Sequence, residues 1–171
     1  MFFLKELSHT IQLHPSYFGP DLRSYIKNKL HSDVEGKCSG RYGYIITVIN
    51  LTSIGSGKIL SGSGLAEFDV KYNAVVLRPF KGQVLDAVVV SVNNQGFFCS
   101  VGPLTVFVSM LNIPSYLKYD STSLTPSFRS NDIVLQKDMA VRIKLISCRM
   151  EASTIITLGS IQDDFLGVVA P

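Results

Sequence analysis

Tryptophan is absent from this 171-residue sequence, and cysteine occurs only three times, at Cys38, Cys99 and Cys148. The three cysteines are far apart, and no C-x-x-C pair is present. This excludes both a disulfide framework and a cysteine-rich zinc site. We therefore expect a reducing compartment, in which each cysteine serves as a small apolar side chain.

Long apolar runs are also missing, although hydrophobic residues make up 46% of the sequence and the mean hydropathy is +0.27. No segment approaches the roughly 18 apolar residues that a membrane span requires. The opening segment MFFLKELSHTIQ contains Lys5 and Glu6 and has no leader pattern. We therefore expect no membrane partner. The apolar excess is expected in strands, or on surface covered by permanent partners.

The sequence also lacks a strong excess of positive charge. Residues 1–79 hold nine Lys and Arg against six Asp and Glu, whereas residues 80–171 hold seven of each. A protein that grips nucleic acid alone through phosphates normally has a basic excess. The neutral second half therefore argues against strong autonomous binding of nucleic acid.

Patterns that carry catalysis or cofactor binding are missing too. His9, His14 and His31 lie outside any grouping of metal-ligand type. The segment GSGKILSGSG, residues 55–64, lacks the spacing of a phosphate-binding loop, because Thr52 stands where the first glycine is needed. No G-x-S-x-G nucleophile motif occurs. We expect no enzyme activity, cofactor or metal, and we interpret residues 54–64 as a flexible connection.

The first half of the sequence predicts one helix and three strands. Strands are expected at Phe2–Leu13, Tyr42–Leu51 and Leu65–Leu77, the last with clean alternation of charged and apolar residues. Between them, a helix begins near Asp21, has Pro20 at its start and ends before Gly36. Its apolar face is predicted to hold Leu22, Tyr25, Ile26 and Leu30. These elements predict an α+β domain over residues 1–79, with the helix on an antiparallel sheet of three or four strands.

The second half, residues 80–171 after the junction Arg78-Pro79-Phe80, predicts an all-β domain. Five short strands with a long polar connection at Asn112–Asp138 match a Greek-key OB-fold barrel. The tail Asp163–Gly167 is expected to be a docking segment. The strands are predicted at Gln83–Val92, Phe97–Val101, Leu104–Val108, Ala140–Cys148 and Ser153–Ile161.

Two aromatic residues in this barrel are candidates for stacking on nucleotide bases. Phe98 follows the polar turn Asn93–Gly96, and Phe107 lies on the next strand, so both rings could share an outer face. The alternative is that either ring fills the core, which is what we expect for Phe97 because adjacent strand residues face opposite sides. Candidate phosphate contacts are Lys81, Arg142, Lys144 and Arg149. The alternative for each cation is a solvated surface balanced by carboxylates.

These residues carry a family resemblance. Phe80–Ser109 resembles the OB-type RNA-binding domain named after ribosomal protein S-one. The whole chain resembles a narrower family, the RNA polymerase stalk subunits, which include the seventh subunit of RNA polymerase II and its archaeal counterpart. The segments that carry this second resemblance are MFFLKELSHTIQLHPSYFGPDL, EGKCSGRYGYIITV, YNAVVLRPFKG, GPLTVFVS and GSIQDDFLG, in that order.

The resemblance implies a non-catalytic nuclear subunit that supports transcription initiation. Such subunits pair with the fourth polymerase subunit, dock with their first domain on the core enzyme near the clamp, and contact nascent single-stranded RNA weakly with the OB domain. Two departures from the OB family, Gln95 in place of an aromatic residue and Phe107 in place of a polar one, lower the expected RNA affinity. The alternatives are a stalk subunit of RNA polymerase I or III, a free-standing RNA-binding factor, and a purely structural adaptor.

Overall fold

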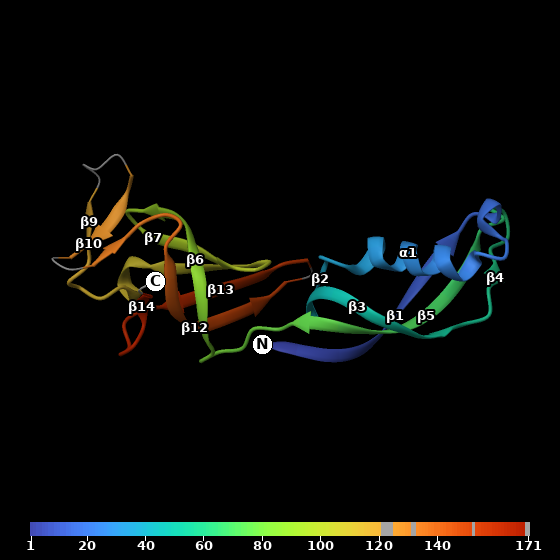
Figure 1. The fold of residues 1–171 in the computed structure, drawn as a ribbon, viewed down its shortest axis with the longest axis horizontal. Coiled ribbons are helices and arrows are strands. Elements are labelled where there is room, and N and C mark those ends of the chain that lie inside the picture. Colours follow the sequence, from blue (N-terminus) through green and yellow to red (C-terminus); the bar gives the residue numbers. More distant parts are fainter. Residues whose placement is uncertain (121–124, 131–132, 152, 170–171) are drawn as a thin grey trace. The chain divides into compact units, whose positions relative to one another are not determined.

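The computed structural model describes residues 1–120, 125–130, 133–151 and 153–169 (Figure 1). The chain divides into two compact units, Met1–Arg78 and a second unit that begins at Pro79. Each unit has its own sheet and is described separately.

The first unit is built on three strands of twelve residues each: β1 (Phe2–Leu13), β3 (Gly43–Ile54) and β5 (Ala66–Leu77). The strand order is β1-β5-β3-β2, and all pairs are antiparallel. Strand β2 (Cys38–Ser39) lies at the edge, and β4 (Lys58–Ile59) pairs with β5. The segment 54–64, predicted to be a flexible connection, thus contains the short strand β4, in which Lys58 and Ile59 pair with Glu67 and Ala66.

One face of this sheet is covered by helix α1 (Leu22–Val34), which follows the short 3-10 helix η1 (Pro15–Tyr17) (Figure 1). Ile26, Leu30 and Val34 are buried against the sheet, and Leu22 packs at the edge of the same core. These positions are four residues apart, which places them on one helical stripe.

The prediction that Tyr25 belongs to this buried stripe is wrong. Its side chain is 44% exposed, because position 25 is rotated away from the line of Ile26 and Leu30. The Tyr25 ring packs instead on Tyr17 of η1, with 5.1 Å between the ring centroids.

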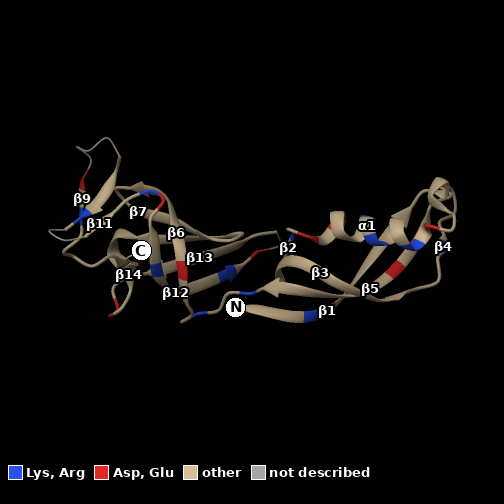
Figure 2. Ribbon diagram, in the orientation of Figure 1, with Lys and Arg blue, Asp and Glu red and all other residues tan. Residues whose placement is uncertain are grey.

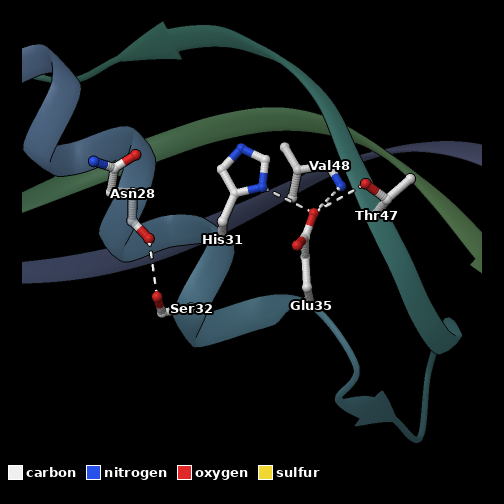
Figure 3. A network of polar contacts seen from close by, with 6 residues as sticks. All are labelled: Asn28, His31, Ser32, Glu35, Thr47 and Val48. Carbon is white, nitrogen blue, oxygen red and sulfur yellow. Dashed lines mark hydrogen bonds and ion pairs between the residues drawn. The ribbon is translucent and has the colours of Figure 1, made fainter.

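A carboxylate joins the end of the helix to the sheet (Figure 3). Glu35 is the C-cap residue of α1, and its carboxylate accepts hydrogen bonds from the backbone N–H of Val48 at 2.8 Å and from the hydroxyl of Thr47 at 3.0 Å. The same carboxylate oxygen lies 2.8 Å from Nδ1 of His31. The hydrogen bond from Val48 is the main reason that the pKa of Glu35 lies below its ordinary value, with partial desolvation acting in the opposite direction.

The second unit is a closed five-stranded barrel, as predicted. Its strands are β6 (Val84–Asn93), β7 (Gly96–Val101), β8 (Leu104–Ser109), β12 (Ala140–Met150) and β13 (Ile155–Ser160). They follow the order β13-β8-β7-β6-β12, and antiparallel pairing of β12 with β13 closes the ring. The pairing of β13 with β8 is parallel.

The connection between the third and fourth barrel strands contains more structure than the predicted polar excursion. After the 3-10 helix η2 (Met110–Asn112), the strands β9 (Lys118–Asp120), β10 (Ser127–Arg129) and β11 (Val134–Leu135) form a small antiparallel sheet. Phe128 and Leu135 are fully buried, which explains why this polar-looking segment still folds. Residues 121–124 and 131–132 of the connection lie outside the described residues.

The end of the chain adds a short strand to the barrel. β14 (Gly167–Val168) pairs with β12, opposite Val141 and Arg142. The residues before it form a turn in which the backbone N–H of Leu166 donates to the carbonyl of Asp163. Phe165 in this turn is 95% exposed. Docking of the segment Asp163–Gly167 on a partner stays a prediction.

Candidate nucleic-acid interface

The two candidate stacking residues are neighbours on the outside of the barrel. Phe98 on β7 lies directly opposite Phe107 on β8, and their ring centroids are 4.8 Å apart with 40° between the ring planes. Phe98 is 36% exposed and Phe107 is partly buried beside it. Such a tilted pair offers a continuous apolar surface on which a base can stack.

A glycine sets the register that brings these rings together. Gly96, at the start of β7, pairs with Ser109 and has a backbone φ of +144°. A Cβ at this position would overlap the carbonyl oxygen of Val108, so only glycine allows the two strands to approach this closely. The polar turn before Gly96 thus fixes Phe98 opposite Phe107.

The neighbouring ring of Phe97 points the other way. Its side chain has no exposed surface and fills the barrel core, as predicted. Cys99, two residues further along the same strand, is also fully buried, and burial raises the pKa of its thiol to about 12.

The structure adds two residues that the sequence analysis missed. Leu158 on β13 is the register partner of Phe107 and is 40% exposed, so it extends the aromatic pair by one strand. Ile156, two residues earlier on the same face, is 49% exposed. The sequence predicted a strand at Ser153–Ile161, but it did not reveal that β13 pairs in parallel with β8.

We call Phe98, Phe107, Leu158 and Ile156 the apolar row. Arg142 lies outside this apolar row, on the half of β12 that pairs with β6. It is directly opposite Asp86, and its guanidinium donates to both carboxylate oxygens, Nε to Oδ1 at 2.7 Å and Nη2 to Oδ2 at 3.1 Å. This hydrogen-bonded pair lowers the pKa of Asp86 and raises that of Arg142.

Lys144 shares the outer face of β12 with Arg142, and it too has a carboxylate partner. Its Nζ lies 2.7 Å from Oδ2 of Asp163 in the C-terminal turn. Each of these cations is therefore neutralised by a carboxylate within the chain, which weakens its attraction for a phosphate.

The remaining candidate cations, Lys81 and Arg149, are exposed and have no ion-pair partner among the residues that the structure describes. Arg149 lies on the far half of β12, opposite Ile156 of β13. Lys81 lies in the turn before β6, where the backbone N–H of Gly82 donates to the carbonyl of Leu145 at 2.7 Å. Arg149 is thus the candidate cation next to the apolar row.

Across the described part of the chain, no group of His, Cys, Asp and Glu side chains is arranged to hold a metal ion. Within the same residues, no helix is long and apolar enough to cross a membrane.

Comparison with known families and proteins matches both units. The model described as "SHS2 domain found in N terminus of Rpb7p/Rpc25p/MJ0397" matches residues 8–64, and the S1 RNA binding domain matches residues 78–158. The chain is 50% identical to DNA-directed RNA polymerase II subunit rpb7 of Schizosaccharomyces pombe over 170 residues, which cover 98% of this chain and 99% of that protein. The chain belongs to the Rpb7 family.

Two further relatives show how widely this similarity extends. The chain is 44% identical to RNA polymerase II subunit RPB7 of Saccharomyces cerevisiae over 171 residues, which cover 99% of this chain and 100% of that protein. It is 26% identical to RNA polymerase subunit Rpo7 of Saccharolobus shibatae over 148 residues, 86% of this chain and 82% of the archaeal protein. The resemblance to polymerase stalk subunits is thereby confirmed, and the Rpb7 family is one of accessory subunits, distinct from the catalytic ones.

Proposed function

We propose that this chain is the stalk subunit of RNA polymerase II. In this role it forms a heterodimer with the fourth subunit in the nucleus, docks through residues 1–79 beside the clamp and the RNA exit channel, contacts nascent RNA with its barrel and supports initiation. The observation that carries the proposal is the similarity over the whole chain to proteins named as the seventh subunit of this enzyme. The similarity covers both units, which supports a docking role for the first unit and contact with the transcript for the second.

The barrel contributes an apolar platform for unpaired bases. Phe98 and Phe107 supply the rings, and Leu158 lies beside them on β13. Arg149 and Lys81 are the cations without a described ion-pair partner, whereas Arg142 and Lys144 are neutralised by Asp86 and Asp163. A platform rich in apolar surface and poor in free cations favours stacking on single-stranded RNA over phosphate recognition.

Weak binding is sufficient for this role because the barrel is tethered. Residues 80–171 carry equal numbers of acidic and basic side chains, so their affinity for free RNA is expected to be low. A short connection to the enzyme gives an effective RNA concentration on the order of millimolar. The docked subunit thus contacts a transcript that the free subunit would not retain.

A first experiment tests the assembly. The tagged full-length chain, expressed at its natural level, should co-purify with the complete set of RNA polymerase II subunits. It should be poorly soluble alone and soluble when co-expressed with the fourth subunit. Recovery with RNA polymerase I or III subunits, or as a stable free monomer, contradicts the proposal.

A second experiment tests the contact with RNA. In a stalled elongation complex with a photoreactive nucleotide in the emerging transcript, crosslinks are expected on residues 95–109 and 145–158. Absence of any adduct on the barrel, in complexes that contain the chain, favours the purely structural adaptor.

A further inference from the structure

Hydroxyl side chains supply the polar groups next to the rings of Phe98 and Phe107. The strands β7, β8 and β13 contain no Lys, Arg, Asp or Glu (Figure 2). On the outer face of the barrel, Ser100 follows Phe98 by two residues, and Thr105 precedes Phe107 by two residues. Ser100 and Thr105 are register partners, and we call them the hydroxyl pair. On these three strands, polar recognition beside the rings therefore depends on hydroxyls and not on charge.

The hydroxyl pair is available to a ligand. Thr105 is exposed and Ser100 is half-buried, and neither hydroxyl has a hydrogen-bond partner among the residues that the structure describes. The carbonyl of Thr105 accepts the hydroxyl of Thr157 at 2.7 Å, a bond that holds β8 to β13 without using the Thr105 side chain. Each hydroxyl of the pair can therefore both donate and accept a hydrogen bond.

The hydroxyls on the opposite side of the rings are used within the chain. On β8, the hydroxyl of Ser109 accepts the backbone N–H of Leu111 at 3.4 Å and caps η2. On β13, the hydroxyl of Ser160 donates to the carbonyl of Asn112 at 3.3 Å and accepts the backbone N–H of Gln162 at 3.2 Å. The two sides of the rings thus differ, and the hydroxyl pair lies on the side where hydrogen-bonding capacity is left over.

The candidate cation of this surface lies on the same side as the hydroxyl pair. Arg149 on β12 is the register partner of Ile156. The parallel pairing of Thr157 with Val106 places Ile156, one residue earlier, beside Thr105. The hydroxyl pair, Ile156 and Arg149 therefore form a line across neighbouring strands. This line runs beside the line of the rings, two residues or roughly 7 Å further along the strands.

From this arrangement we infer that Ser100 and Thr105 bind the ribose 2′-OH of a nucleotide whose base stacks on the rings, and thereby select RNA over single-stranded DNA. A stacked nucleotide carries its sugar to one side of the rings, and the side of the hydroxyl pair also offers Arg149 to the adjoining phosphate. The 2′-OH is both a donor and an acceptor, whereas deoxyribose has no group to pair with these hydroxyls.

This contact is expected to be independent of base sequence, because all four ribonucleotides carry the same 2′-OH. Stacking on the rings also tolerates any base. A transcript of any sequence can therefore be recognised as RNA at this surface. The inference rests on the proposed function, which supplies the transcript.

The first test compares ribose with deoxyribose at one position of the transcript. Stalled elongation complexes of purified polymerase that contains the full chain are assembled on synthetic transcripts. Each transcript carries a single photoreactive 4-thiouridine, which is moved one nucleotide at a time along the emerging RNA. At the position that crosslinks most strongly to residues 95–109, the same nucleotide is then supplied in its 2′-deoxy form. We expect the yield of adduct to fall about three- to tenfold, the effect of one net hydrogen bond. Equal yields overturn the inference.

The second test removes the hydroxyls and keeps the rings. In the double variant Ser100→Ala, Thr105→Val, the ribose and deoxyribose transcripts should give equal yields. Thr105→Val alone changes one exposed position and should lose part of the discrimination, so the result does not depend on the folding of the double variant. The matched control Ser109→Ala should keep full discrimination, because the Ser109 hydroxyl is engaged with Leu111. Discrimination that persists in the first two variants, or that is lost in Ser109→Ala, overturns the inference.

The outcomes separate this inference from the function on which it rests. If no transcript gives an adduct on the barrel, in complexes that contain the chain, the proposed contact with RNA fails and the inference fails with it. If ribose and deoxyribose transcripts crosslink equally to residues 95–109, the contact with RNA holds and only the role of the hydroxyl pair fails.

Discussion

Glu35 receives the backbone N–H of Val48 across thirteen residues of sequence, and this hydrogen bond ties the end of helix α1 to strand β3 (Figure 3). The carboxylate takes two further contacts, from Thr47 and His31. Helix and sheet therefore meet through one polar group at the end of an otherwise apolar interface.

Replacing Glu35 by Ala should weaken this end of the first unit by about 1–2 kcal/mol, because a charged acceptor of a backbone donor is lost. Hydrogen exchange followed by mass spectrometry on the co-expressed complex should show faster exchange in residues 45–50. The control is Asp33→Ala, which removes only the surface ion pair with Lys29. Equal exchange in both variants contradicts the prediction.

The same carboxylate predicts a direction for acid sensitivity. The pKa of Glu35 is lower in the folded chain than in the unfolded chain, so its contribution to stability is complete above the unfolded value. That contribution is lost as the pH falls below the ordinary glutamate pKa of about 4.3 and through the lower folded value. Thermal unfolding of the complex should show a smaller loss on acidification in Glu35→Gln than in the wild type.

Gly96→Ala should destabilise the barrel by at least about 2 kcal/mol, because a Cβ there combines an unfavourable φ with overlap of the Val108 carbonyl. Gly102→Ala is the matched control. Gly102 also has a positive φ, +58°, but a Cβ there meets no atom within 4 Å, so we expect a cost of only about 1 kcal/mol. The thermal midpoint of the co-expressed complex measures both, and equal shifts would show that the close approach is unimportant.

Phe98→Ala and Phe107→Ala should each reduce RNA crosslinking in stalled elongation complexes. Each variant removes a stacking ring, and the loss of one stacked base costs about 1–3 kcal/mol of RNA-binding free energy. Leu158→Ala should have a smaller effect in the same direction. Val134→Ala, an exposed position on β11 of the same unit, serves as the control. Unchanged crosslinking in the Phe98→Ala, Phe107→Ala double variant would exclude this face as the RNA site.

Arg149→Ala and Arg142→Ala should differ in their effect on RNA. Removal of Arg149 should make RNA contact less dependent on salt. The slope of the logarithm of RNA contact against the logarithm of salt concentration should decrease by about 0.7, as expected for the loss of one phosphate contact with a single strand. Arg142→Ala should leave the slope unchanged, because Asp86 already neutralises Arg142. Titration of the crosslink yield with salt measures both variants, and a reversed order contradicts the assignment.

Cys99 should resist alkylation in the folded chain. Burial raises the pKa of its thiol to about 12, so almost no thiolate exists at pH 8. The raised pKa also means that stability falls as the pH rises above the unfolded thiol value of about 8.5, by at most about 1.4 kcal/mol per pH unit. Cys99→Val should lack this pH-dependent loss of stability when unfolding of the complex is followed from about pH 8 to 11. Modification of Cys99 at the rate of a free thiol would contradict the prediction.

Much of the fold was predictable because its elements are encoded locally. Alternation identified β5, short strand-like segments between turns identified the barrel strands, and the spacing of Leu22, Ile26 and Leu30 identified the buried stripe of α1. Tyr25 was misplaced because an aromatic residue next to the stripe is apolar enough to fit the pattern. The sheet of β9, β10 and β11 was missed because its strands have only two or three residues each, too short for a periodicity to be visible.

The sequence by itself determined the two-part architecture, the Phe98 and Phe107 candidates and the family, because turn residues, periodicity and residue order are local properties. Only the tertiary structure decided which side chains are neighbours. Closure of the barrel brought Leu158 beside Phe107, although the two residues are far apart in the sequence. The fold also pairs Arg142 with Asp86, which is 56 positions away in the sequence. Arg142, predicted to contact phosphate, is therefore part of a neutral ion pair. Long-range register depends on how the whole sheet closes, which no local pattern contains.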